Sequence, residues 1–267
     1  MHRITPLAAI LVLIASNTAA SDVHPERVVS LDYCADQYLL KMLPTSRILA
    51  LSPDADKHFS YMRDAAAGVQ KVRPLAENIL NLQPDLVVRS YGGGPRIGSF
   101  LNQVGVKVLQ LPYTNNLTEI RTAIEVIAEQ LGVPERGAEI LIEMDTRLGA
   151  INTKSSTRKA LYMTPTGVTS GSGTLVHEML LTAGFENFQK QAGWRSLPLE
   201  RLVYEQPDLV AAAFFDENAV QSERWSSMRH PVAKQQLRNQ PTVMLQGAWT
   251  SCGAWFLLDA IEALAAK

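Results

Sequence analysis

Aromatic side chains gather at particular places in this sequence. Aromatic residues make up 7% of the 267 residues, yet many of them lie at or near the ends of short apolar runs that have the pattern of buried strands. The members of this set are Tyr33, Phe59, Tyr91, Tyr113, Trp194, Phe214, Phe215 and Trp249. Such rings stack on large, flat, partly apolar ligands, although they also pack at interfaces between lobes. The set as a whole predicts a ligand-binding cleft.

No arrangement of residues typical of catalysis accompanies these rings. The sequence has no GxSxG, GxxxxGK[ST] or HExxH motif and no paired CxxC motifs. SGSGTL at 170–175 has the composition of a phosphate-binding loop, but no GxGxxG fingerprint accompanies it. The histidines lack metal-ligand spacing: His58 stands alone near a strand end, and His177 falls in a predicted amphipathic helix. We therefore predict a protein that is not an enzyme and has no metal site and no prosthetic group.

Short strands and helices alternate along the chain and must position these residues. Four apolar runs of the first half have the composition of buried strands, and they lie at 28–31, 47–52, 86–88 and 105–114. The second half repeats the alternation in KALYM, in DLVAAAFF and in PTVMLQ, with helical spacing between them. Such alternation predicts parallel β–α units.

One stretch of sequence occurs twice. ENILNLQPDLVV at 77–88 and ERLVYEQPDLVA at 200–211 are identical at six of twelve aligned positions. The repeat predicts an α/β fold with two similar lobes and mainly parallel sheets. Between the lobes, Glu135 to Ile151 has helical spacing and would span about 25 Å as a rigid strut. The expected domains are residues 21–115, a helical connection at 116–153, and residues 154–267.

Composition and the first residues predict the location of the protein. A formal net charge of −1 and 46% hydrophobic residues are typical of a soluble globular protein without a nucleic-acid partner. Arg3, an apolar run from Leu7 to Ala15, and small residues up to Ala20 have the order of a signal peptide at 1–20. A buried N-terminal helix is the alternative. No cysteine follows the expected cleavage site, so we expect a soluble periplasmic protein without a lipid anchor.

The segments together resemble a known family, the periplasmic substrate-binding proteins of metal-chelate ABC importers. Members carry vitamin B12, ferric siderophores or haem, and the sequence is most similar to the vitamin B12-binding type. The resemblance rests on RVVSLDYCADQYLL, ENILNLQPDLVV, GSGTLVHEMLLTAGFEN, LPLERLVYEQPDLV and WTSCGAWFLLDAIEAL, which occur in the family's order. It implies a monomer with a cleft between its lobes that captures a chelate and delivers it to a membrane permease.

The resemblance also gives the repeated stretch a role. In the family, each lobe presents one glutamate that docks onto an arginine of one permease subunit. Glu77 and Glu200 occupy the matching positions, each eight residues before the aspartate of its QPD motif. A two-lobed carrier that meets a two-fold symmetric permease dimer needs the same contact twice. Alternatively, both are helix-start residues favoured by the helix dipole.

The cleft residues bear on the transported ligand, which is not a resident cofactor. The predicted ligand-binding set is Tyr33, Cys34, Phe59, Tyr91, Arg96, Tyr113, Trp194, Phe215, Trp249 and Cys252. Corrinoids favour aromatic stacking and hydrogen bonds at the ring edge, catecholate siderophores favour several arginines, and haem requires an axial Tyr or His. Arg89, Arg96 and Arg195 suit an anionic chelate, and Tyr33 or Tyr91 suits an iron, but we place a corrinoid first.

Three other functions were weighed against a carrier of chelates. An α/β cleft enzyme lacks catalytic motifs. A ligand sensor that serves no importer would have no reason to repeat Glu77 at Glu200. A carrier of bare zinc or manganese needs more converging ligands than His58 supplies.

The only two cysteines, Cys34 and Cys252, each follow a predicted strand at its carboxyl end, one in each lobe. We therefore expect both to lie on the cleft lining. Export and an even count favour a disulfide. Free thiols that contact the ligand or its metal, and unpaired packing, are the alternatives. We expect a disulfide here to hold the lobes shut against a large ligand.

Overall fold

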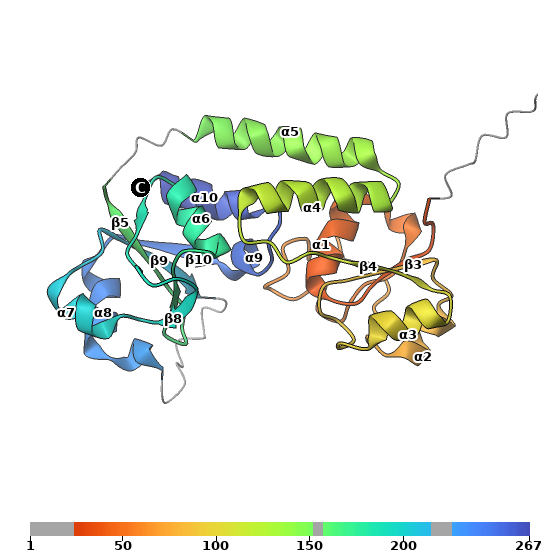
Figure 1. The fold of residues 1–267 in the computed structure, drawn as a ribbon, viewed down its shortest axis with the longest axis horizontal. Helices are drawn as coiled ribbons and strands as arrows, with labels where there is room; N and C mark the ends of the chain where they lie inside the picture. The colour runs from red at the N-terminus through yellow and green to blue at the C-terminus, as the bar shows by residue number, and fades with distance from the viewer. Residues whose placement is uncertain (1–23, 152–156, 215–225) are drawn as a thin grey trace, which may run out of the picture.

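The computed structural model describes residues 24–151, 157–214 and 226–267, and it has two α/β lobes (Figure 1). Each lobe contains one four-stranded parallel sheet. The first sheet has the order β2-β1-β3-β4, with β1 (Val28–Ser30), β2 (Ile48–Ala50), β3 (Leu86–Arg89) and β4 (Lys107–Gln110). The second has the order β10-β9-β5-β7, with β5 (Lys159–Met163), β7 (Glu186–Asn187), β9 (Leu209–Phe214) and β10 (Thr242–Gln246). Numbered along the chain, both sheets run second, first, third, fourth, so the predicted fold class of two similar α/β lobes is confirmed.

Helices and one small sheet complete the lobes. The first lobe has α1 (Tyr33–Met42), η1 (Thr45–Arg47), α2 (Ala76–Asn81) and α3 (Ile97–Gln103). The second has α6 (Leu175–Thr182), α7 (Leu199–Tyr204), η2 (Ser227–Arg229), α8 (Pro231–Asn239), α9 (Gly247–Thr250) and α10 (Leu257–Ala265). An antiparallel pair, β6 (Val168–Ser170) and β8 (Trp194–Ser196), lies outside the main sheets. No helix among the described residues is both long enough and apolar enough to cross a membrane.

The repeated QPD motif makes the same junction in both lobes. The Asp85 carboxylate accepts a hydrogen bond from the Arg27 backbone N–H at 3.1 Å, and the Asp85 N–H donates to the Arg27 carbonyl at 3.1 Å. Asp208 forms the equivalent pair with Lys159, at 2.6 and 2.8 Å. In each lobe the aspartate therefore fastens the start of the third strand to the start of the first.

Two antiparallel helices connect the lobes. α4 (Leu117–Gln130) lies beneath α5 (Pro134–Ala150), which extends across both lobes in Figure 1. The chain reverses at Gly132, which has a φ of +69°, and α5 then begins with a proline at its first position, where no backbone N–H is needed. The 17 residues of α5 span about 25 Å, so the predicted strut is confirmed to within one residue at each end.

The two lobes share one hydrophobic core. A single cluster of buried side chains includes Leu39 of the first lobe, Ile124 of α4, Ile140 of α5 and Leu258 of the second lobe. A continuous core marks no sharp boundary between the lobes. The predicted domain limits therefore stay a proposal, with domains at 21–115, 116–153 and 154–267. The predicted signal peptide, residues 1–20, lies outside the described residues.

Candidate ligand-binding cleft

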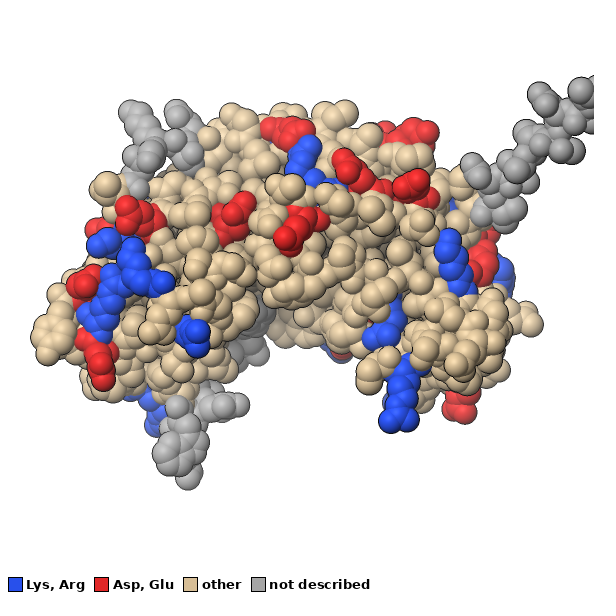
Figure 2. Space-filling view, viewed as in Figure 1, with Lys and Arg blue, Asp and Glu red and all other residues tan. Residues whose placement is uncertain are grey.

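A cavity of about 540 Å³ lies between the lobes. Its size is typical of small-molecule sites in proteins. Six of the predicted ligand-binding residues line it, namely Tyr33, Cys34, Tyr91, Tyr113, Trp194 and Cys252. The space-filling view shows the molecule hollowed between the lobes on the side away from α5 (Figure 2).

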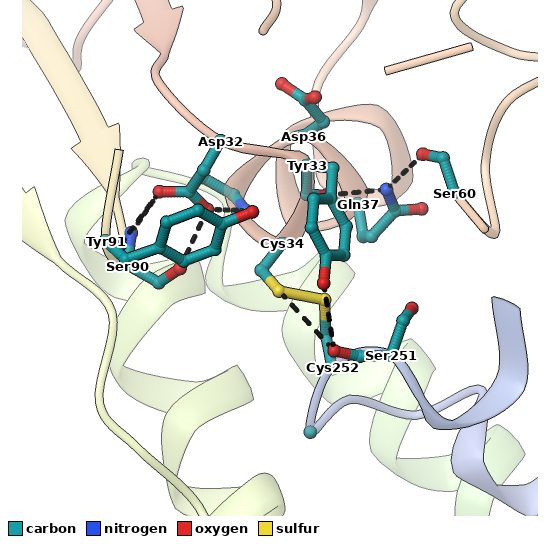
Figure 3. The surroundings of a disulfide bond; sticks show 12 residues. Asp32, Tyr33, Cys34, Asp36, Gln37, Ser60, Ser90, Tyr91, Ser251 and Cys252 are labelled. Carbon is teal, nitrogen blue, oxygen red and sulfur yellow. Dashed lines mark hydrogen bonds between the residues drawn. A yellow bond between two sulfur atoms is a disulfide. The ribbon is translucent and has the colours of Figure 1, made fainter. Parts of the chain in front are cut away.

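One buried carboxylate builds the first-lobe wall of the cavity. Asp32 caps the N-terminus of α1, and its side chain accepts a hydrogen bond from the Ala35 N–H at 3.0 Å. The same carboxylate accepts hydrogen bonds from the backbone N–H groups of Tyr91 at 3.0 Å and Gly92 at 2.9 Å (Figure 3). Asp32 thereby fixes the positions of Tyr33, in the first turn of α1, and Tyr91. We did not predict this role, although an aspartate directly between a strand and a helix is a recognisable N-cap signal.

The tyrosine rings of this wall contact one another. The Tyr33 ring centroid lies 5.9 Å from that of Tyr91 and 5.0 Å from that of Phe59, and both pairs are edge-to-face. Phe59 is not on the cavity lining, so the structure places it behind Tyr33 as a support. Burial raises the pKa of the Tyr33 and Tyr91 hydroxyls and so favours their neutral form. Tyr91 and Tyr113 are 54% and 79% exposed, so their rings are available at the cavity.

Trp194 provides the aromatic group on the second-lobe side. It is 50% exposed, and its ring meets the buried Tyr162 edge-to-face at 6.1 Å. Trp194 begins strand β8, which pairs with β6. β8 has only three residues, all exposed, so the sequence carries no apolar alternation that would indicate a strand.

The part of the cavity lining that the structure describes carries no charged side chain. Its polar side chains other than tyrosine are Ser90, Gln110, Thr114, Thr250 and Ser251. The remaining lining is aromatic, aliphatic or sulfur-containing. Such a surface suits a flat ligand whose edges make neutral hydrogen bonds.

Arg96 and Trp249, like Phe59, do not line the cavity. Arg96 is exposed at the N-cap of α3, because the YGGGP loop carries the chain away from the cavity to the start of that helix. Trp249 is half-buried and packs against the shared core, so the structure does not bring it to the cavity lining. Phe215 lies outside the described residues. Arg89 and Arg195, whose charge suits an anionic chelate, are also absent from the lining.

The two cysteines form a disulfide. Their Cα atoms are 5.7 Å apart, so the predicted proximity is confirmed, whereas the free-thiol and unpaired alternatives are wrong (Figure 3). The expectation that a bond would hold the lobes shut is also wrong. Cys34 and Cys252 lie where the lobes already touch, as shown by the Tyr38 hydroxyl donating to the Gly253 carbonyl at 3.0 Å, and the cavity remains beside them.

Glu77 and Glu200 occupy matching places in the two lobes. Each is the second residue of a six-residue helix, α2 or α7, whose N-cap residue makes no side-chain capping bond. Both side chains are exposed, and neither forms an ion pair with another described residue. In Figure 1, α2 and α7 lie on different lobes and away from α5. This placement is compatible both with docking and with a favourable position in the helix dipole.

No group of three or more His, Cys, Asp or Glu side chains in the described part of the chain could hold a metal ion. His177 is hydrogen-bonded to the Asn187 side chain at 3.2 Å and is not on the cavity lining.

Comparison with known proteins gives a family match and structural neighbours. A family model described as "Periplasmic binding protein" matches residues 28–248. The periplasmic haem-binding protein HutB of Vibrio cholerae is similar in structure, with a TM-score of 0.75, 16% identity, and coverage of 90% of this chain and 97% of that one. The periplasmic vitamin B12-binding protein BtuF of Vibrio cholerae gives 0.61 and 20%, with coverage of 91% and 96%. At these identities the likeness shows a shared fold.

One curated relative is also similar in sequence. The uncharacterized ABC transporter substrate-binding lipoprotein YvrC of Bacillus subtilis (strain 168) is 25% identical over 147 residues, which are 50% of this chain and 47% of YvrC. The matched region therefore spans about half the length of that relative.

Proposed function

Because this chain belongs to the periplasmic binding protein family, we propose that it is the substrate-binding component of an ABC importer and that it carries a planar metal chelate. The family and the relatives named above are binding proteins of transport systems, and we propose a binding role here rather than catalysis. The proposal includes export to the periplasm with cleavage near Ala20, and action as a monomer.

The observation that carries the proposal is the aromatic, uncharged lining of the described part of the cavity. Tyr33, Tyr91, Tyr113 and Trp194 line the same space of about 540 Å³, and the other polar side chains of its lining carry hydroxyls and one amide. Aromatic faces stack on a flat ring, and neutral polar groups bind the ring's edge without leaving a buried charge unpaired.

Among these chelates we place a corrinoid first. Its ring is planar, and amide side chains surround it, so hydroxyls and Gln110 supply suitable partners. A catecholate siderophore is strongly anionic, and the described lining offers it no arginine or lysine. Haem is the second candidate. Tyr33 and Tyr91 line the cavity, phenols can ligate haem iron, and HutB is a haem-binding protein.

Titration of purified protein with separate chelates tests the proposal. Aquocobalamin, haemin, a ferric hydroxamate and a ferric catecholate are added in turn, and intrinsic tryptophan fluorescence is followed. We expect aquocobalamin to bind most tightly and to quench the fluorescence. The quenching should be much smaller in Trp194→Phe, whereas Trp249→Phe serves as the matched control that keeps it, because Trp194 lines the cavity and Trp249 does not.

Two results would change the proposal. If no chelate binds more tightly than about 10 μM, near −7 kcal/mol, the carrier proposal fails. If haemin binds most tightly, and if Tyr33→Phe or Tyr91→Phe alters its absorption spectrum, haem replaces the corrinoid as the ligand.

We further propose that Glu77 and Glu200 dock the loaded protein onto the permease. Their matched positions in α2 and α7, their exposure and their lack of ion pairs among the described residues support this role. Two arginines related by the two-fold axis of a permease dimer would receive them.

A further inference from the structure

The Cys34–Cys252 disulfide is a covalent link between the lobes within the cleft itself. Cys34 lies in the first turn of α1, and Cys252 follows α9, 218 residues later. Both residues line the cavity. The sequence contains only these two cysteines, so this is the only intramolecular disulfide the chain can form. The bond is therefore part of the wall of the site.

The other contacts at this place are individually weak. The Tyr33 hydroxyl donates to the Ser251 carbonyl at 3.4 Å, and the Ser251 hydroxyl donates to the Phe59 carbonyl at 3.1 Å. Like the bond between Tyr38 and Gly253, these are neutral hydrogen bonds that compete with water, so each adds little to the net stability of the junction. The disulfide is the one strong connection in this set.

The segment after Cys252 also fits closely against the first lobe. A Cβ added at Gly253 would lie 1.9 Å from the Thr114 hydroxyl oxygen, so the backbone approaches that side chain as only glycine allows. The spacing between the two walls is consequently well defined at this point.

Residues next to the disulfide present the binding groups. On one side, Tyr33 precedes Cys34 and contacts Tyr91. On the other side, Thr250 and Ser251 precede Cys252, and all of these residues line the cavity. A ligand that fills the cavity touches both walls at once, so its affinity depends on how accurately the walls are held before it binds.

We propose that the disulfide is a positioning element of the ligand site, that it sets the spacing of the two walls, and that its sulfur atoms contact the bound chelate. Opening the bond loosens the junction and lowers affinity. This inference rests on the proposed function, since it requires a chelate in the cleft.

The first test compares affinities. The Cys34→Ser/Cys252→Ser variant is titrated with aquocobalamin and with haemin, with Trp194 fluorescence as the signal. For whichever chelate binds the wild type, we expect Kd to rise about tenfold, mainly through faster dissociation. Met163→Ala is the control for lost stability alone, because Met163 is buried in a separate second-lobe cluster that contains no lining residue, and its Kd should not change. An unchanged Kd in the double serine variant would overturn the inference.

The second test keeps the native sequence and applies even if the serine variant does not fold. Dithiothreitol reduces the protein disulfide to two thiols and is itself oxidised to a cyclic disulfide. Bound chelate should slow this reduction about tenfold, because it covers sulfur atoms that line the cavity, whereas a disulfide with a purely structural role away from the ligand would show no protection. Equal reduction rates with and without chelate would overturn the inference. If none of the four chelates of the titration binds the oxidised wild type, the proposed function fails instead.

Discussion

At the scale of single residues, Asp36 is a buried carboxylate whose environment can be tested by pH. It lies in α1, and its oxygens accept hydrogen bonds from the Ser52 N–H at 2.9 Å and the Ser52 hydroxyl at 2.6 Å. Burial is the main cause that raises its pKa from 3.8 to about 6. The native state therefore holds the proton more tightly than the unfolded state does.

A raised native pKa gives the sign of the pH dependence. The stability that Asp36 contributes is fully present below pH 3.8 and is lost as the pH rises through about 6. The shift of about two units corresponds to roughly 3 kcal/mol in the free energy of unfolding. Asp36→Asn keeps an acceptor and a donor for Ser52 but cannot ionise. Urea unfolding gives the free energy of unfolding of both proteins at each pH. We expect the wild-type value minus the variant value to fall by roughly 3 kcal/mol as the pH rises from below 3.8 through about 6.

Asp64→Asn is the matched control, because Asp64 is exposed in the same lobe. Its difference from the wild type should stay within about 0.5 kcal/mol over the same pH range. A wild-type-minus-Asp36→Asn difference that is flat or rises with pH would contradict the raised pKa.

The sequence predicted residue types at the cleft better than it predicted which of them reach the cavity. Tyr33, Tyr91 and Tyr113 follow strands at the carboxyl edge, so topology alone places them. Trp249 also follows a strand, but it continues into α9 and packs inward, and strand order cannot give that direction. The role of Asp32 was not predicted, because in the sequence an N-cap is only a local signal. The fold alone shows that the same carboxylate also binds the loop that contains Tyr91.

At the scale of elements, Arg147 connects the strut to both lobes. From α5 it donates to Asp259 at 2.5 Å and to both oxygens of Glu262 at 2.8 Å, in α10. The Tyr61 hydroxyl of the first lobe donates to the same Asp259 at 2.8 Å. The hydrogen bond from Arg147 lowers the pKa of Glu262 below its usual range. These side chains are partly buried, so the pair is worth more than a surface ion pair.

Arg147→Met should lower the free energy of unfolding by about 1–2 kcal/mol at neutral pH. Because the pKa of Glu262 is depressed in the native state, this contribution is present above its ordinary value of 4.5 and is lost as the pH falls. Urea unfolding at neutral and acidic pH measures both effects. Lys190→Met, which removes an exposed pair with Glu186 at 3.9 Å, should cost less than about 0.5 kcal/mol. An equal cost in the two variants would contradict the role of Arg147.

The elements differ in how well the sequence predicts them. β3 begins with an apolar run, and α5 begins at a proline and keeps its helical spacing for 17 residues, so both are evident. The β6–β8 pair is polar and short, and residues 52–75 form turns held by scattered hydrogen bonds. Neither has a period that a sequence pattern could reveal.

At the scale of the whole molecule, the lobes should move little when a ligand binds. The shared core, the strut and the disulfide all join them. We expect backbone shifts of about 1 Å, as in other preorganised complexes, and an unchanged radius of gyration by small-angle X-ray scattering with and without aquocobalamin or haemin. A marked compaction on binding would show a hinge that the structure does not suggest.

The duplicated lobes lead to a prediction about docking at the membrane. Two similar lobes present Glu77 and Glu200 at equivalent places, outside the cavity lining. Reversal of both charges, Glu77→Lys with Glu200→Lys, should abolish uptake by the importer reconstituted in liposomes and leave the chelate Kd unchanged, because complementary charge governs encounter with the partner. Each single reversal should reduce uptake partially, and the residual rate should vary with salt because exposed charges are screened.

Glu129→Lys with Glu135→Lys makes the same change in net charge at exposed positions on α4 and α5, and it should transport normally. Undiminished uptake by the first double variant would show that the two glutamates are merely favourable helix-start residues.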